Sequence, residues 1–344
     1  MGQNTEHIAI GITLLQISYA SRIRPSLCPN ISHVMDDVLV VGEALVDIVR
    51  RLDGSTDEHP GGSPANVALG LGRLGRRVSL LTRFGDDARG ASIRARLEAS
   101  AVQIVAASQS AAPTSTATAT LDAAGVATYE FEIDWRLPDE AHSLAQLGRG
   151  GLPARALHTG SIAAFLQPGG DAVYDLVAEA AGSMTITYDP NARPKLMGDP
   201  AAARERVERF VTHCDLVKVS DEDLEWLSPG EDPAEVVERW LQLGPAVVIL
   251  TRGGAGALGV CRAGQADVSP VPITVVDTVG AGDSFMSGLL DYLAEANLLG
   301  GEHRAALQAL DLKDLTAMLE HAVRISAITC QRAGADPPTR SDLA

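Results

Sequence analysis

Apolar runs alternate with amphipathic stretches along most of this chain. Residues 38–49 are almost continuously apolar, as in a strand that a parallel sheet buries on both faces, and only Glu43 and Asp47 interrupt the run. Further strands are expected at 78–87 (with a turn), 156–159, 184–188, 216–219 and 246–250, and helices at 65–74, 90–100, 172–181, 201–211, 234–243 and 315–330. Repeated strand–helix units predict an α/β fold, with a mostly parallel central sheet and helices on both faces.

The two carboxylates in the first apolar run each require a reason, because burying a charge without a partner is unfavourable. Asp47 lies near the end of the predicted strand, where an α/β sheet presents groups to a ligand. The other interpretation is a solvated carboxylate at the edge of the sheet.

Residues 113–135 follow a different pattern. Residues 114–121 and 126–133 alternate between apolar and polar, and turn-forming residues 122–125 join them, which predicts an antiparallel hairpin. Tyr129, Phe131 and Trp135 gather here in a chain with only 4% aromatic residues. The hairpin is either an ordinary sheet face or a lid over a ligand the size of a sugar.

Residues 273–293 read as a strand, a glycine turn and a helix. A β-branched run at 273–276 precedes Gly280, Ala281 and Gly282, and apolar residues then recur at helical spacing. Such a turn exposes free N–H groups at the positive end of a helix, which is a ready anion site. Asp283, in the first helical turn, is either a helix cap or a reactive carboxylate.

A second glycine turn, Gly61-Gly62, precedes the helix predicted at 65–74. Ser63 is suited to cap that helix, with Pro64 at its first position, and Asn66 lies in its first turn. Two GxGxxG matches are rejected as dinucleotide sites, because neither stands between a strand and a helix. They comprise Gly70, Gly72 and Gly75, and Gly254, Gly256 and Gly259.

An anion site beside a carboxylate suits phosphoryl transfer to an alcohol. Amides would stabilise charge on the moving phosphoryl group, while Asp283 would accept the hydroxyl proton. The chain has no GxxxxGK[ST] motif, so it is not a P-loop enzyme. The isolated residues His158 and His213 fit the core or the surface better than catalysis. The acidic residues 221–223 could begin a helix or hold Mg²⁺ through water.

Composition excludes several classes of function. The chain has 344 residues, 46% hydrophobic and 21% charged, which is ordinary for a globular protein, and its formal net charge of −16 argues against nucleic acid or an anionic membrane as partner. Four scattered cysteines without metal-site spacing indicate reduced thiols in a cytoplasm. Residues 1–34 are expected to be a poorly ordered extension, or to precede a true start at Met35, and residues 35–344 to form one domain with lid segments around 48–60 and 113–135.

Two motifs carry a family resemblance. Asp277-Thr278-Val279-Gly280-Ala281-Gly282-Asp283-Ser284-Phe285 resembles the C-terminal signature of the PfkB (ribokinase-like) carbohydrate kinases, and Gly61-Gly62-Ser63-Pro64-Ala65-Asn66 resembles their N-terminal signature. The resemblance covers about residues 37–338 and implies a ribokinase-like fold with a small β lid. It also implies a kinase that uses ATP and Mg²⁺ and is usually stimulated by K⁺.

The resemblance assigns roles to individual residues. Asp283 would be the catalytic base, and its amide would form an anion hole with those of Gly280, Ala281 and Gly282. The sugar would be bound by Asp47, Gly61, Gly62, Asn66, Phe131 and Arg193, and the nucleotide by Lys218, Ser220, Thr251, Gly253 and Gly256. Asp223 would hold Mg²⁺ through water, and Asp277 and Val279 would border a monovalent cation.

Within the family the chain is most similar to fructokinases, in residues 42–47, 61–68, 188–194 and 218–222. One departure is Ser220-Asp221-Glu222-Asp223, where many members carry Asn-x-x-Glu, and it leaves the metal site open. The leading hypothesis is an ATP-dependent kinase for fructose. Alternatives are a kinase for ribose or a sugar acid such as 2-keto-3-deoxygluconate, or a silent sugar-binding protein, although a silent relative would be expected to lose Asp283 and its glycines. A homodimer formed through the lid is a further possibility.

Overall fold

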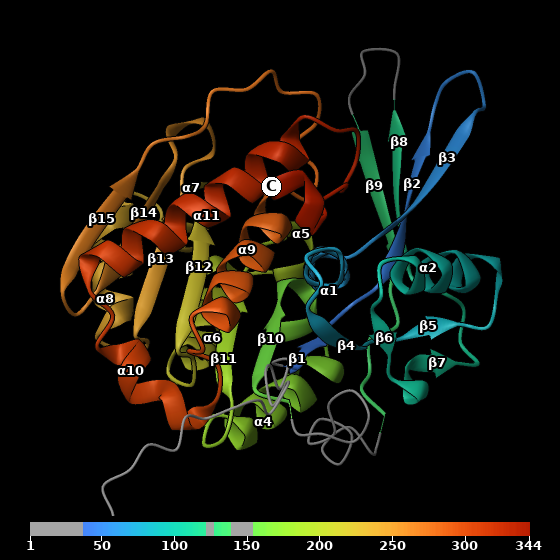
Figure 1. Ribbon diagram of the computed structural model, residues 1–344. Coiled ribbons are helices and arrows are strands. Elements are labelled where there is room, and N and C mark those ends of the chain that lie inside the picture. Colours follow the sequence, from blue (N-terminus) through green and yellow to red (C-terminus); the bar gives the residue numbers. More distant parts are fainter. Residues whose placement is uncertain (1–36, 122–126, 139–153) are drawn as a thin grey trace, which may run out of the picture. The chain divides into compact units, whose positions relative to one another are not determined.

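The computed structural model describes residues 37–121, 127–138 and 154–344. The extension expected at 1–34 and the hairpin turn expected at 122–125 lie outside these residues. Within them, the largest sheet has nine strands in the order β15-β14-β13-β12-β11-β10-β1-β4-β6 (Figure 1). The strands are β1 (Asp37–Val41), β4 (Arg77–Leu81), β6 (Gln103–Ile104), β10 (Ala156–Gly160), β11 (Thr185–Asp189), β12 (Leu216–Ser220), β13 (Val247–Thr251), β14 (Ala257–Cys261) and β15 (Gly264–Val268).

This large sheet is mostly parallel, as the sequence predicts. Every strand pair from β6 to β13 is parallel, and only β14 and β15 run antiparallel to their neighbours. Parallel strands end at one edge of a sheet, so the residues that follow β1, β10, β11, β12 and β13 gather there. That edge is where a ligand site is expected.

Helices cover both faces of the large sheet, which confirms the α/β prediction. Val38 and Val40 of β1 belong to a core shared with α1, α9 and α11, whereas Leu39 and Val41 belong to a second core with α4, α6, α7 and α8 (Figure 1). The helices are α1 (Ser63–Arg73), α2 (Ala88–Ala99), α4 (Gly169–Ala180), α5 (Pro194–Met197), α6 (Pro200–Val211), α7 (Asp221–Leu227), α8 (Pro233–Leu241), α9 (Ala281–Glu295), α10 (Arg304–Gln308) and α11 (Leu312–Cys330). None of the helices in the described ranges has the length and apolar character needed to cross a membrane.

The apolar run 38–49 is two strands rather than the single strand predicted. It breaks after β1, and β2 (Leu45–Arg50) joins a separate sheet. The break falls at Gly42, where an added Cβ would lie 2.2 Å from the Pro64 ring. Apolar periodicity could not reveal this break, because both strands are buried.

In a second, smaller sheet, β2 pairs with one strand on each side. In the described residues this small sheet has four strands in the order β3-β2-β8-β9, with β3 (Thr56–Gly61), β8 (Thr116–Leu121) and β9 (Ala127–Glu132). β8 and β9 pair antiparallel, which confirms the hairpin prediction. Two further short strands, β5 (Phe84–Gly85) and β7 (Gln109–Ser110), pair beside α2.

The prediction of a strand at 273–276 is wrong. Residues 269–280 have no regular secondary structure, and Val275 and Val276 are 57% and 61% exposed. The amides of Val276 and Asp277 instead donate to the Cys330 carbonyl at the end of α11. A β-branched run forms a strand only when a neighbouring strand accepts its hydrogen bonds, and here a helix end takes that place.

Candidate active site

Asp283 is buried in the first turn of α9, where two side chains of α1 hold its carboxylate. Ser63 Oγ donates to Asp283 Oδ1 at 2.7 Å, and Asn66 Nδ2 donates to Oδ2 at 2.8 Å. The prediction that Ser63 caps α1 is wrong. The helix begins two residues earlier than expected, with Gly62 as its N-cap, so the Ser63 hydroxyl is directed to a residue 220 positions away.

The contact between α1 and α9 depends on close helix packing. An added Cβ on Gly70 would lie 2.3 Å from Ser287 Oγ, so only glycine allows this approach. Ser287 Oγ donates to the carbonyls of Val67 on α1 and Asp283 on α9. Gly70, rejected above as part of a dinucleotide motif, therefore has a packing role that brings Ser63 and Asn66 to Asp283.

The electrostatics of Asp283 combine opposing effects. Burial raises the pKa of its carboxyl above the ordinary value, while the hydrogen bonds from Ser63 and Asn66 and the charges of Lys218 and Arg193 lower it. The net direction is upward. A carboxylate tuned in this direction accepts a proton near neutral pH more effectively than an exposed one.

The turn before α9 presents free backbone donors beside this carboxylate. In the described part of the chain the amides of Gly280, Gly282 and Asp283 have no acceptor, whereas the Ala281 amide donates to the Thr278 carbonyl at 3.1 Å. Gly280 has φ +75°, a left-handed conformation that favours glycine. Three free amides at the positive end of a fifteen-residue helix are suited to binding an anion, and Ala281 contributes no free donor to them.

The small sheet presents Asp47 on one of its faces. Strand register aligns His59, Asp47, Ala117 and Phe131 across β3, β2, β8 and β9, and residues aligned in this way share a face. Gly61 leaves room for the carboxylate, because an added Cβ would lie 2.2 Å from Asp47 Oδ2. The sequence predicted Asp47 near the end of a strand of the large sheet. The structure places it within β2 of the small sheet instead.

Asp47 keeps an exposed face, yet the surrounding protein removes enough water to raise its pKa to about 6. The charges of Arg193 and His59 oppose this rise, and that of Asp283 adds to it. Arg193 thus lies within electrostatic reach of both Asp47 and Asp283, although it comes from the loop before α5. The small sheet, α5 and α9 meet at one group of charges.

Glu43 is buried in the break between β1 and β2. Burial raises the pKa of its carboxyl to about 7, against hydrogen bonds that include the Ala163 amide donating to Oε2 at 3.1 Å. A buried carboxylate requires a partner, and here the partner is a backbone amide from the turn after β10. Arg193 also lowers the pKa of Glu43, which places the residue near the same group of charges.

Two of the residues assigned to the nucleotide lie side by side where β12 and β13 end. Ser220 and Thr251 are paired in register, and the turn after β13 carries Gly253 and Gly256 at positive φ. Lys218 differs, because it is buried and donates to Asp189 Oδ2 at 2.7 Å. Sequence reasoning did not select Asp189, which ends β11.

The candidate metal residues already accept backbone hydrogen bonds. Asp223 closes a capping box with Ser220 at the start of α7, and its Oδ1 accepts the Ala192 amide at 2.7 Å. Asp277 accepts the amides of Val279 and Gly334. The described residues include no group of three or more His, Cys, Asp or Glu side chains arranged to hold a metal ion.

The two histidines have packing roles. His158 is fully buried, Nδ1 contacts Thr187 Oγ1 at 3.0 Å, and burial lowers its pKa to about 3, so it is neutral. His213 contacts the Tyr174 hydroxyl at 3.1 Å. Both agree with the interpretation that these side chains belong to the core or the surface.

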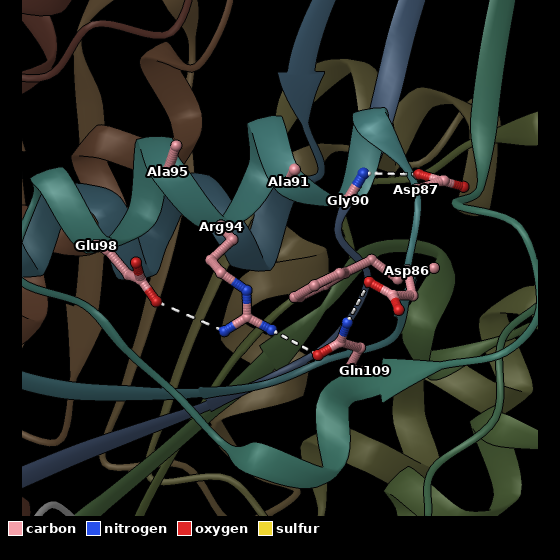
Figure 2. Close-up of a pocket in the computed structure, with 10 residues that line it drawn as sticks. Asp86, Asp87, Gly90, Ala91, Arg94, Ala95, Glu98 and Gln109 are labelled. Carbon is pink, nitrogen blue, oxygen red and sulfur yellow. Dashed lines mark hydrogen bonds and ion pairs between the residues drawn. The ribbon is translucent and has the colours of Figure 1, made fainter.

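A surface recess beside α2 is lined by none of the residues predicted for the site. Figure 2 shows that its polar side chains bond to one another, with Arg94 reaching Glu98 and Gln109, and Gln109 reaching Asp86. Such internal pairing differs from the convergent free groups of a ligand site. The candidate active site is therefore the region around Asp283.

The chain is similar to a family of proteins of known activity. The sequence pattern of the pfkB family of carbohydrate kinases matches residues 35–342. A fructokinase of Rhizobium leguminosarum bv. trifolii is 34% identical over 282 residues, which are 80% of this chain and 86% of that relative.

Two crystal structures of fructokinase from Vibrio cholerae O395 are also similar. One, bound to fructose, ADP and calcium, is 27% identical with a TM-score of 0.70, and covers 88% of this chain and 94% of its own. The other, a double mutant bound to fructose, ADP and potassium, is 26% identical with the same TM-score and coverage. The chain belongs to the pfkB family of carbohydrate kinases and has their ribokinase-like fold.

Proposed function

We propose that this protein transfers the γ-phosphoryl group of ATP to a hydroxyl of fructose. The observation that carries the proposal is the Asp283 carboxylate, fixed by Ser63 and Asn66 beside the free amides of Gly280, Gly282 and Asp283. A proton acceptor and an anion site in one helical turn are the two groups that phosphoryl transfer to an alcohol needs.

In this mechanism Asp283 accepts the proton of the attacking hydroxyl. Two hydrogen bonds orient its carboxylate, and burial makes it a stronger base than an exposed aspartate. The free amides stabilise negative charge on the phosphoryl group as it moves, at no cost of reorganisation. The nucleotide lies along Ser220, Thr251, Gly253 and Gly256, beside the same edge of the large sheet.

The sugar is held between the small sheet and α5. Asp47 and Phe131 share the face of the small sheet on which Asp47 faces the charges of Arg193 and Asp283. Lys195 of α5 places its ammonium 4.6 Å from the centre of the Tyr129 ring on β9, which links the small sheet to the main body. We propose that the small sheet is the lid of the sugar site.

The sugar identity rests on the relatives. The Rhizobium protein is named a fructokinase, and the two Vibrio structures contain fructose and ADP. Gly61 and Asn66 lie beside the two carboxylates of this region, since Asn66 donates to Asp283 and an added Cβ on Gly61 would lie 2.2 Å from Asp47 Oδ2. Fructose is therefore the substrate that the comparisons favour.

Two cations are part of the proposal. Both Asp223 oxygens already accept amides, so Mg²⁺ fits only as an ion carried by the phosphates, with Asp223 reached through water. Hydrogen bonds from Val279 and Gly334 lower the pKa of Asp277, which stays ionised and suits a monovalent cation bordered by Val279. Magnesium would balance phosphate charge, and potassium would stabilise the loop before α9.

The decisive experiment is Asp283→Asn in a coupled assay of ADP release. The asparagine amide can donate to the Ser63 hydroxyl while its carbonyl accepts from Asn66, so we expect the variant to fold and to bind fructose. We expect turnover to fall at least about 10²-fold, the scale of general base catalysis. Turnover close to that of the wild type would remove Asp283 from the mechanism.

The same assay identifies the sugar. With Mg-ATP and K⁺, we expect fructose to give a higher kcat/KM than ribose, glucose, 2-keto-3-deoxygluconate or nucleosides. Preference for another of these would correct the substrate and leave the role of Asp283 intact. Turnover of none of them would favour a sugar-binding protein without activity.

A further inference from the structure

A buried ion pair lies beneath the anion site. Asp189 ends β11, and Lys218 lies on the neighbouring strand β12, where Nζ donates to Asp189 Oδ2 at 2.7 Å. The two side chains are 1% and 5% exposed. Asp189 has no part in the mechanism above.

Stability is a weak reason for such a pair. Removing two charges from water is unfavourable, and well-packed apolar residues of similar size often serve a core equally well or better. The second oxygen of Asp189 also accepts no hydrogen bond within the described residues, which a purely structural pair would be expected to avoid.

The position of the lysine suggests what the pair does. An added Cβ on Gly282 would lie 3.0 Å from Lys218 Nζ, so the ammonium lies directly beside the turn with the free amides. Burial alone would lower the pKa of Lys218, but the carboxylates of Asp189, Asp223 and Asp283 raise it above the ordinary value. The turn therefore has a fixed positive charge as its neighbour.

Lys218 also has donors to spare. An ammonium has three N–H groups, and within the described part of the chain one of them is used, by Asp189. The other two are free to meet an anion held by the amides of Gly280, Gly282 and Asp283. An unrestrained lysine would lose side-chain entropy each time it met that anion, and a prior bond to Asp189 removes part of this cost.

We propose that Asp189 is a positioning residue for phosphoryl transfer, which holds the Lys218 ammonium beside Gly282 so that its charge reaches the phosphoryl group at the anion site. This inference rests on the proposed function, because it assigns the anion to the transferred phosphoryl group. Charge on that group changes during the reaction, so the pair acts mainly on kcat and little on the KM for fructose.

The test compares Asp189→Asn, Lys218→Met and the double variant with the wild type, by ADP release and by thermal unfolding. Each single variant leaves one charge of the pair without its opposite charge, so we expect Tm to fall by at least about 5 °C. The double variant has neither charge of the pair, and we expect its Tm to return to near that of the wild type. Its kcat should nevertheless stay about 10²-fold low, the effect of losing one donor to developing charge.

Asp215→Asn provides a matched control. Asp215 is a buried carboxylate just before β12, at the opposite end of that strand, and it accepts from Arg304 Nε at 2.6 Å. We expect its loss to lower Tm while leaving kcat within about twofold of the wild type.

The outcomes separate the two proposals. Recovery of kcat together with Tm in the double variant would show that the pair is only structural, and would overturn the inference. A KM for fructose that rises while kcat holds would do the same. The proposed function is judged separately, by turnover of the wild type and its loss in Asp283→Asn.

Discussion

Removing the Ser63 hydroxyl should move the pH at which the enzyme gains activity. Ser63→Ala deletes the 2.7 Å hydrogen bond to Asp283 Oδ1 and leaves the bond from Asn66 in place. The hydrogen bond from Ser63 favours the ionised carboxylate, so its loss raises the pKa of Asp283 further. Because the base must be ionised to accept a proton, the acidic limb of the pH profile moves to higher pH.

The size of the shift follows from the bond. A hydrogen bond to a charged group contributes about 1.5–3 kcal/mol, and about 1.4 kcal/mol corresponds to one pKa unit. The adjoining turn at Gly280 to Gly282 is partly exposed, so water replaces part of the lost bond. We therefore expect a shift of roughly one pH unit.

The assay is the pH dependence of kcat/KM for fructose, which reports groups of the free enzyme. Asp47, with a pKa of about 6, also titrates in this range, so the comparison with the wild type identifies the midpoint that moves. Ser287→Ala is the matched control, because this buried serine joins the same two helices through backbone carbonyls only. An acidic limb that stays in place in Ser63→Ala, or moves equally in Ser287→Ala, would refute the reasoning.

Two further predictions concern stability in urea. Folding raises the pKa of Glu43 from 4.5 to about 7, so its contribution to the free energy of unfolding is present below pH 4.5 and is lost as pH rises through about 7. Between pH 4 and 8, the free energy of unfolding of Glu43→Gln should therefore increase by up to about 3 kcal/mol relative to that of the wild type. A difference that stays constant with pH would contradict this. Gly62→Ala would force φ +103° on alanine and bring its Cβ to 2.5 Å from the Glu43 carbonyl oxygen. It should lose about 2 kcal/mol more than Gly54→Ala, which has φ +82° but open space around it, and equal losses would refute the clash.

The sequence predicted the features that depend on local pattern. Repeated apolar runs predicted the α/β sheet, and alternation at 114–133 predicted the hairpin of β8 and β9. The glycine turn before α9 predicted free amides next to Asp283, because helix ends expose donors whatever the rest of the fold does. Those three features rely on short-range physics.

The features that sequence reasoning missed depend on packing between distant segments. Ser63 is equally suited to cap α1 or to reach Asp283, and only the approach of α9 decides between them. Asp189 and Lys218 are 29 residues apart, and strand order places them together. The signal that could have found the pair was a lysine inside a buried strand, since a buried ammonium requires a partner.

The surroundings of Asp283 show why a carboxylate that acts as a base is best both buried and hydrogen-bonded. Burial without partners would leave the carboxyl protonated and unable to accept a proton, whereas full pairing with charges would make it too weak a base. Hydrogen bonds from Ser63 and Asn66 lower the pKa that burial raises, and the positive charges of Lys218 and Arg193 lower it as well. Asp47 lies on the small sheet and interacts with the charges of Arg193 and Asp283, so closing that sheet over a sugar, as proposed, would change the charge and the water around the base. Under the proposed function, the pKa of the base would thus be coupled to sugar binding, which would favour proton transfer after the sugar is enclosed.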